Sequence, residues 1–495
     1  MTVIEPTTVR ALVGRSDDHP ALVVPESGTS LSYAELQRSL DRAAGRLAAL
    51  GVGKGDRVAL VANGAALITA FLAVDALGAA AAPLNPALGA AELTAELDDL
   101  RVSRLLHDGA AKAVTAAASA RVPASVIGFE HSLLQIDGQA GHPLDAADDP
   151  DAIGLLLHTS GTTSKPKTVP IRQRNLVAST SVVAATYGLN ADDVTMCVMP
   201  LFHVHGLVAA VLATLSTGGT VVVPGWRPST FWDDAARHGA TWYTAVPTIH
   251  SRLLTQALER PAPGVHRLRF VRSCSAPLHA ALWQRYEDAI SVPLVEAYGM
   301  TEAAHQMASN PLPPGERRPG TVGRATGVDL AALDENWRRV PPGEQGEVSV
   351  RGPSVVDHYL DNPDATAASF RHGWFRTGDV GTLSADGYLT LVGRIKEFIN
   401  RAGEKISPYE IEDVLLSHPA VAEAAAYPVP DEQYGEQVGV VVVLRGEATP
   451  AELGAHCKER LAAFKRPARV TILPEIPLGP TGKVQRRNLD ALVDG

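Results

Sequence analysis

A polar loop, residues 158–167, offers the groups that bind a chain of phosphates. It contains three threonines, two serines, one glycine and two lysines. The apolar residues 153–157 before it predict a short buried strand, so we expect the loop to leave a strand end. Backbone N–H groups and hydroxyls donate to phosphate oxygens, and Lys165 or Lys167 can neutralise their charge. The spacing of a Walker A loop is absent, and an ordinary polar surface turn remains the alternative.

Two further segments place carboxylates where a nucleotide could use them. Tyr298 follows an apolar run, and we expect a turn there that presents its ring for stacking on a base. Glu302 offers oxygen ligands to a hard cation such as Mg2+. Asp379 follows Gly378 in an expected tight loop, where a carboxylate can accept from both hydroxyls of a ribose. For each segment taken alone, a structural turn remains the alternative.

Two histidines one residue apart, His203 and His205, would lie on one side of an extended segment. They could bind a metal, although no third ligand with matching spacing is near, or they could donate to a carboxylate. Around Cys274 the G-x-S-x-G pattern of a nucleophile elbow is absent. We therefore expect Cys274 to be a small core residue.

The composition is that of a soluble globular protein with two or three structural units. The chain has 495 residues, of which 45% are hydrophobic and 20% charged. A net charge of −10 disfavours a nucleic-acid or membrane surface. The three cysteines are far apart, which predicts neither disulfides nor a structural zinc. No secretory segment, membrane span or C-terminal targeting signal is visible, so we expect a cytoplasmic protein.

Strand-like and helical segments alternate along the first part of the chain, which predicts an α/β fold of layered sheets and helices. Residues 57–61 and 219–224 have the pattern of strands, and residues 65–77 and 229–238 that of helices. Because sequential strands alternate with helices, we expect largely parallel sheets.

A domain boundary is expected near residues 393–397. Beyond it Ser407 is a helix N-cap followed by proline, and two strand-like segments, a helix and a further strand complete a compact α+β unit. A unit of about 100 residues is large enough to fold. The expected domains are residues 1–394 and residues 395–495.

Five motifs make the chain resemble the AMP-forming acyl-CoA synthetases, a superfamily that also contains peptide-synthetase adenylation domains and firefly luciferase. The motifs are residues 159–167, 298–302, 376–379, 393–397 and 481–483. The resemblance covers essentially the whole chain. It implies a large N-terminal domain, a small mobile C-terminal domain, and an active site between them that uses ATP, Mg2+ and coenzyme A.

The resemblance also assigns roles by position in the motifs. The ATP phosphates would contact Thr159, Ser160, Gly161, Thr162, Thr163, Lys165, Lys167 and Thr301. Adenine would be flanked by Glu296, Ala297 and Tyr298, the ribose would bind Asp379, and Arg394 would also contact the nucleotide. Glu302 would hold Mg2+, Gly403 would approach CoA, Lys396 would be the hinge, and Lys483 would serve the adenylation step. Ser164 and Thr168 stand where the family usually has glycine, which leaves the shape of the loop open.

A narrower resemblance is to the oxalate–CoA ligases of plants and fungi. It is carried by residues 200–207, 240–250, 272–276, 300–307 and 309–313. A dianion of two joined carboxylates needs several hydrogen-bond donors and little apolar volume. The donors assigned on this basis are His203, also taken as catalytic, and His205, Ser275 and His305. A ligase for malonate or a short fatty acid, a free-standing amino-acid adenylation enzyme, and a nucleotide-binding protein without catalysis remain alternatives.

Overall fold

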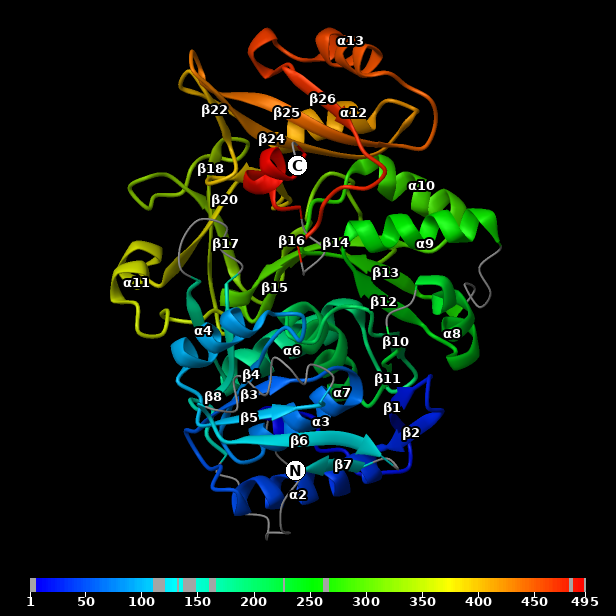
Figure 1. The fold of residues 1–495 in the computed structure, drawn as a ribbon, viewed down its shortest axis with the longest axis vertical. Helices are drawn as coiled ribbons and strands as arrows, with labels where there is room; N and C mark the ends of the chain where they lie inside the picture. Colours follow the sequence, from blue (N-terminus) through cyan, green and yellow to red (C-terminus); the bar gives the residue numbers. More distant parts are fainter. Residues whose placement is uncertain are drawn as a thin grey trace.

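The chain is α/β, with a large N-terminal part and a smaller C-terminal part (Figure 1). The computed structural model describes residues 6–109, 121–130, 133–136, 148–159, 166–225, 228–260, 267–479 and 484–493. Two large sheets and two five-stranded sheets are present in these ranges. No helix of the described residues is long and apolar enough to cross a membrane.

A seven-stranded sheet, in the order β7-β6-β5-β3-β4-β8-β9, carries the polar loop. Its strands are β3 (Arg57–Val61), β4 (Ala80–Pro83), β5 (Arg104–His107), β6 (Ala124–Glu130), β7 (Leu133–Ile136), β8 (Ile153–His158) and β9 (Thr168–Arg172). The central pairs from β6 to β8 are parallel, and α3 (Gly64–Asp75) and α4 (Ala90–Leu100) connect strands of this sheet. Strand β9 returns antiparallel beside β8. The polar loop therefore joins two neighbouring strands.

A nine-stranded sheet, in the order β16-β15-β14-β13-β12-β10-β11-β1-β2, positions most of the other predicted site residues. Its strands are β1 (Pro20–Val24), β2 (Thr29–Ser32), β10 (Val194–Met196), β11 (Thr220–Val222), β12 (Trp242–Ala245), β13 (Phe270–Ser273), β14 (Leu294–Met300), β15 (His305–Ser309) and β16 (Arg324–Ala325). The strands from β1 and β11 through β14 pair in parallel. Polar residues after β13 and β14 therefore meet at one edge of the sheet.

The helices associated with these sheets are α1 (Val9–Leu12), α2 (Tyr33–Ala49), α6 (Gln173–Tyr187), the π-helix η1 (His205–Leu212), α7 (Ala213–Ser216), α8 (Phe231–His238), α9 (Pro247–Glu259) and α10 (Ala280–Ile290). Short 3-10 turns are η2 (Pro228–Thr230) and η4 (Thr301–Ala303). Ser32 begins α2 with a capping box shared with Glu35. Strand β3 has the predicted bounds, while the predicted strand 219–224 is shorter and the two predicted helices differ by one or two residues at their ends.

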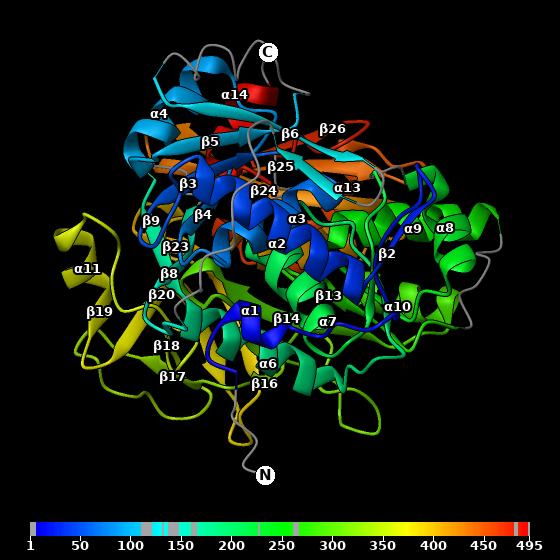
Figure 2. The same ribbon diagram turned by 90° about the horizontal axis from the view of Figure 1, so that it is seen from below.

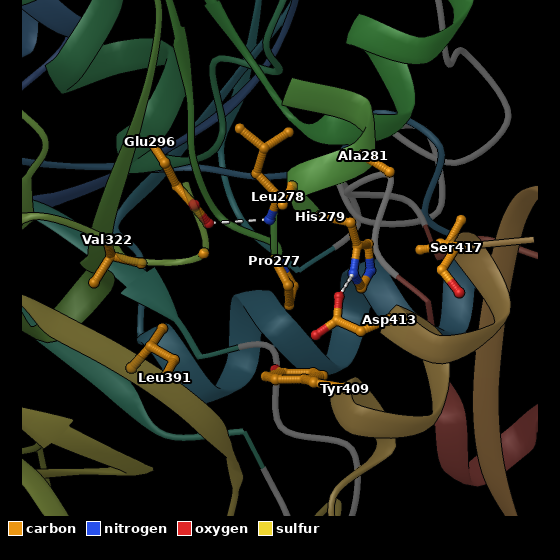
Figure 3. A pocket seen from close by; sticks show the side chains of 13 residues that line it. Pro277, Leu278, His279, Ala281, Glu296, Val322, Leu391, Tyr409, Asp413 and Ser417 are labelled. Carbon is orange, nitrogen blue, oxygen red and sulfur yellow. Dashed lines mark hydrogen bonds and ion pairs between the residues drawn. The ribbon is translucent and has the colours of Figure 1, made fainter. Parts of the chain in front are cut away.

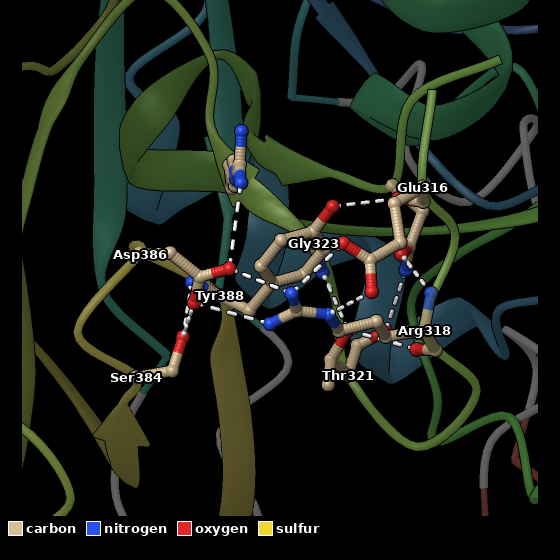
Figure 4. A network of polar contacts seen from close by, with 9 residues as sticks. Glu316, Arg318, Thr321, Gly323, Ser384, Asp386 and Tyr388 are labelled. Carbon is tan, nitrogen blue, oxygen red and sulfur yellow. Dashed lines mark hydrogen bonds and ion pairs between the residues drawn. The ribbon is translucent and has the colours of Figure 1, made fainter. Parts of the chain in front are cut away.

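An antiparallel five-stranded sheet follows, with β17 (Asp329–Leu333), β18 (Gln345–Arg351), β19 (Phe370–Arg371), β20 (Trp374–Leu383) and β21 (Leu389–Arg394), and α11 (Pro363–Ser369) before β19. Arg318 ties the β20–β21 turn to the loop after β15 (Figure 4). Its guanidinium donates to both oxygens of Asp386 at 3.1 and 2.6 Å, and to Glu316 at 2.9 Å. This network anchors the hairpin whose strands carry Asp379 and Arg394.

The C-terminal unit contains the third mixed sheet of the described chain. Its elements are β22 (Ile399–Arg401), β23 (Glu404–Ile406), α12 (Pro408–Leu416), β24 (Val421–Asp431), β25 (Gly435–Leu444), α13 (Pro450–Arg460), η5 (Ala463–Lys465), β26 (Arg469–Ile472), η6 (Arg486–Asn488) and α14 (Leu489–Val493). Ile411 and Leu415 of α12 belong to a separate core that also contains Val440 and Val442 of β25. A separate core supports the expected small domain, whose boundary at residues 394 and 395 remains a prediction.

Helix α3 is buried almost completely, which explains why its sequence is apolar on all sides. It contacts α1, α2 and strands of both large sheets, and Figure 2 shows α2 and α3 side by side. At its C-terminal end Asp75 is 5% exposed and accepts a hydrogen bond from the side chain of Gln173. Burial raises the pKa of Asp75 to about 7.

The buried Asp75 predicts a pH-dependent stability. Its pKa in the unfolded chain is near 4, so between about pH 4 and 7 the folded protein keeps a proton that the unfolded chain releases. Stability therefore falls as the pH rises through this window. We expect Asp75→Asn to melt like the parent near pH 4.5 and at a higher temperature at pH 8. The control is Asp41→Asn, which changes an exposed aspartate. An equal difference from the parent at every pH would contradict the prediction.

Candidate active site

Strand β14 carries Tyr298, which the sequence placed in a turn. The strand continues to Met300 and the chain turns only after it, so that expectation is wrong. The reason is that β15 pairs back on β14, with a bulge between Tyr298 and Gly299. A Cβ at Gly299 would lie 2.0 Å from the carbonyl oxygen of His305, so only glycine permits this pairing.

Asp379 lies within strand β20, not in the expected tight loop. The pairing of β20 with β21 places it opposite Arg394, whose Nε is 3.1 Å from Oδ1. The Tyr298 hydroxyl donates to Oδ2. Burial raises the pKa of Tyr298, so its hydroxyl remains a donor. Three residues that are far apart in the sequence thus form one cluster, in which the carboxylate is fixed from two sides.

Glu302 follows β14 and is almost completely buried. Its Oε1 accepts from the Tyr359 hydroxyl at 2.8 Å. Burial raises the pKa of Glu302, an effect opposed by the positive charges of Arg394 and Lys167. The Lys167 ammonium lies 4.3 Å from the centre of the Tyr359 ring. Burial lowers the pKa of Lys167. Glu302 is therefore a buried carboxylate close to the positive charges of Arg394 and Lys167.

This set of groups fits the Mg2+ that the family implies. No cluster of three or more His, Cys, Asp or Glu side chains that could cage a metal occurs in the described ranges. Mg2+ bound with a nucleotide needs no such cage, because one or two carboxylates, water and phosphate oxygens complete its shell. The buried Glu302 offers such a carboxylate.

The ends of the polar loop are held together. The backbone N–H of Thr159 donates to the Lys167 carbonyl at 2.9 Å, and the N–H of Lys167 donates to the Thr159 hydroxyl at 3.2 Å. Next to it Thr168 donates to Asp99 at 3.2 Å. The Thr168 hydroxyl thus has a hydrogen-bond partner at a position where the family usually has glycine. The predicted phosphate contacts Ser160, Gly161, Thr162, Thr163 and Lys165, and also Ser164, lie outside the described residues.

His158, which precedes the loop, is anchored by two carboxylates. Its Nδ1 lies 2.8 Å from Glu96 Oε2, and its Nε2 lies 3.0 Å from Asp99 Oδ2. Burial opposes a charge on the ring, but the carboxylates of Glu96 and Asp99 raise the pKa of His158. The base of the loop is thereby fixed to helix α4.

A pocket of about 300 Å³ lies between the N-terminal part and helix α12 (Figure 3). Glu296 lines it and accepts from the Leu278 N–H at 3.0 Å, and burial raises the pKa of Glu296 to about 8. Its neighbour Ala297 is buried. Across the pocket His279 Nδ1 lies 2.6 Å from Asp413 Oδ1 of α12. A contact between the two parts of the chain therefore joins two residues that line this pocket.

A second polar cluster lies around the ends of β13 and β15. His205 Nδ1 lies 3.0 Å from the Ser275 hydroxyl, and the rings of His205 and His305 stack with their centres 5.2 Å apart. The structure thus brings three of the four predicted acid-binding residues together. The fourth, His203, precedes η1 and its ring packs against Phe202. The segment is helical from His205 onward and not extended, so the side chains of His203 and His205 are not placed as an extended strand would place them.

The remaining predicted residues are Thr301, Lys396, Gly403 and Lys483. Thr301 begins the short turn after β14. Lys396 follows Arg394 at the end of β21, and its carbonyl accepts from Arg487 at 2.9 Å. Gly403 lies in the exposed β22–β23 turn, and nothing lies within 4 Å of a Cβ built on it. Lys483 lies outside the described residues.

Sequence reasoning missed several residues that support the site. Tyr359, which donates to Glu302, gives no local signal because its segment is irregular. Arg272 does give one, because a charged residue inside the apolar strand β13 is unexpected. It is 0% exposed and donates to His305 Nε2 at 3.0 Å and to Thr244 at 3.0 Å.

Comparison with known proteins agrees with this geometry. Residues 9–360 match the AMP-binding enzyme family and residues 410–483 match the AMP-binding enzyme C-terminal domain. The chain is 46% identical over 479 residues to a probable CoA ligase, CCL9, of Humulus lupulus, covering 92% of this chain and 90% of that protein. It is 45% identical over 475 residues to an oxalate–CoA ligase of Arabidopsis thaliana, covering 92% of each chain.

Among solved structures, ATP-bound MatB from Rhodopseudomonas palustris is similar, with a TM-score of 0.88, 30% identity and 99% coverage of both chains. The chain belongs to the AMP-binding enzyme family, in which it is an AMP-forming acyl-CoA synthetase. As such it joins a carboxylic acid to CoA at the expense of ATP.

Proposed function

We propose that the acid is oxalate and that the product is oxalyl-CoA. The observation that supports this most directly is the polar cluster of His205, Ser275 and His305 beside the buried Arg272. Such a cluster offers donors to a second carboxylate and little apolar surface to an alkyl chain. The similarity to an oxalate–CoA ligase supports the same acid.

The proposed reaction has two steps. One carboxylate of the acid attacks the α-phosphorus of ATP, which forms the acyl-adenylate and releases pyrophosphate. The thiol of CoA then attacks the acyl carbon, and AMP leaves. No protein nucleophile takes part, in agreement with the buried cysteines of the chain, Cys197, Cys274 and Cys457.

The protein would contribute by binding and by electrostatics. Asp379, fixed by Tyr298 and Arg394, would accept from the ribose hydroxyls. Lys167 and the loop before it would neutralise the phosphates. Glu302 would hold Mg2+, which supplies positive charge to the phosphate oxygens when it is bound. Lys483 would act in the first step, as the family resemblance implies.

The acid preference can be tested by measuring AMP release with oxalate, malonate, acetate, butyrate and octanoate in the presence of ATP and CoA. We expect the highest kcat/KM with oxalate. A higher value with butyrate or octanoate would overturn the oxalate assignment and leave the enzyme class unchanged. Absence of AMP release with every acid would favour a nucleotide-binding protein without ligase activity.

Two substitutions test whether the polar cluster binds the acid. Loss of one hydrogen bond to a charged group costs about 1.5–3 kcal/mol, so we expect Ser275→Ala and His305→Ala each to lower kcat/KM for oxalate by roughly tenfold to a hundredfold. The KM for ATP should change little. Ser30→Ala, on the exposed part of β2, is the control. Equal losses with oxalate and an apolar acid would show that the cluster does not recognise the second carboxylate.

A further inference from the structure

Arg272 carries a charge that no acidic side chain balances within the described part of the chain. Its Nε donates to the Tyr187 hydroxyl at 2.9 Å, Nη1 donates to Thr244 at 3.0 Å, and Nη2 donates to Gln306 Oε1 at 3.1 Å and to His305 Nε2 at 3.0 Å. Its partners are thus neutral groups, and the side chain is fully buried. A buried cation without an anionic partner destabilises a protein, so this arrangement requires a reason other than stability.

The contacts of Arg272 fix where the protons of both histidines lie. A guanidinium only donates, so His305 Nε2 must accept and the proton of that ring is on Nδ1. His205 Nε2 lies 2.6 Å from the Thr244 hydroxyl and 3.4 Å from Arg272 Nη1. Because Arg272 Nη1 can only donate, its contact with His205 Nε2 makes that nitrogen an acceptor, so the Thr244 hydroxyl donates to it and the proton of His205 is also on Nδ1.

The same direction of hydrogen-bond donation continues from His205 to Ser275. His205 Nδ1 is the donor in its 3.0 Å contact with the Ser275 oxygen, so the hydroxyl hydrogen of Ser275 is left for another acceptor. Hydrogen bonds are therefore donated along a chain of four groups, from Arg272 to Thr244, then to His205 and then to Ser275. The end of that chain is a serine that is only partly buried.

We propose that Arg272 is the positioning residue that commits the acid site to a carboxylate with a second negative charge. It acts through Thr244 and holds His205 and His305 in the tautomers that carry the proton on Nδ1. In these tautomers the Ser275 hydroxyl and His305 Nδ1 are donors. Its own positive charge favours a dianion over a monoanion, because charges interact strongly in a buried site. The inference rests on the proposed function, since it names what recognises the second carboxylate of the acid.

The test uses Arg272→Met, which keeps the length of the side chain without donors or charge, and Thr244→Val, which has nearly the same shape and breaks the chain at one link. We expect the KM for oxalate to rise about tenfold to a hundredfold in the first variant, and in the same direction in the second. The KM for ATP should stay within about twofold. Arg267→Gln is the control, because it removes an exposed guanidinium shortly before the same strand.

A second readout does not depend on which acid the enzyme uses. The nitrogen resonances of the two histidines, assigned with His205→Asn and His305→Asn, report which ring nitrogen carries the proton. We expect Nδ1–H for both rings in the parent and a loss of this preference in Arg272→Met. If the parent has Nε2–H rings, or if both folded variants keep the parental KM for oxalate, Arg272 does not have this role. If the parent prefers another acid but the tautomers are as expected, the oxalate assignment fails and the positioning role remains.

Discussion

Lys483→Ala is expected to abolish formation of the acyl-adenylate while leaving the second half-reaction intact. In the proposed reaction the ammonium bridges the attacking carboxylate and the α-phosphate, where negative charge accumulates in the transition state. Removing one group that stabilises such charge costs about 100- to 1000-fold in rate. Pyrophosphate exchange measures the first step. Thioester formation from a supplied acyl-adenylate measures the second, in which Lys483 has no role.

The control for this experiment is Lys458→Ala, which removes an exposed lysine from α13 in the same domain. It should leave both half-reactions at the parental rate. Equal losses of the two half-reactions in a Lys483→Ala protein that melts like the parent would show that this lysine is not specific to adenylation.

The fold was predictable where the pattern of apolar residues is set by burial. Strand β3 and helix α3 are examples, because both are almost completely buried and their runs of apolar residues reflect this burial. Predictions failed where tertiary pairing overrides local signals. Gly299 and Gly378 suggested turns, but antiparallel partners extend β14 and β20 through them. A glycine permits a turn without requiring one.

The motifs predicted which residues form the site, but they did not predict how these residues contact one another. Tyr298, Asp379 and Arg394 were each expected to contact a nucleotide, and their mutual contacts depend on the pairing of β20 with β21 and on the position of β14. The role of Arg272 depends on contacts with β12, β15 and α6, which are distant in the sequence. Such a residue can be noticed in the sequence as a charge in a strand, but its partners cannot be read from it.

The second large effect concerns the hinge. The partners of this segment change at Lys396, although the N–H groups of Glu397 and Phe398 still donate to the Arg394 carbonyl at 2.8 and 3.2 Å. On one side the Ile395 N–H donates to the Gly378 carbonyl at 2.8 Å. On the other side the Lys396 carbonyl accepts from Arg487, and Glu397 pairs with Arg486 at 3.3 Å. The side chain of Glu397 is thus tied to the small domain, and rotation about residue 396 would also break the hydrogen bonds from Glu397 and Phe398 to the Arg394 carbonyl.

Rotation is required if the same site first uses Lys483 and later admits CoA. We expect the exposed Gly403 turn, which has open space around it, to approach CoA in the second step after the small domain turns. Such a turn also requires the His279–Asp413 contact to break. We therefore expect a change in the backbone freedom of residue 396 to affect the second step and not the first.

Lys396→Pro is expected to spare adenylation and to slow thioester formation by about 100-fold or more. Proline fixes φ near −65°, and a hinge works by changing its backbone angles. Lys396→Ala removes the same side chain and keeps the backbone free, so it should retain both half-reactions. Pyrophosphate exchange and thioester formation from acyl-adenylate, measured on both variants, separate the backbone effect from the loss of the ammonium. Proportional loss of both half-reactions in Lys396→Pro, or an equal loss of the second step in Lys396→Ala, would mean that residue 396 does not act as a hinge.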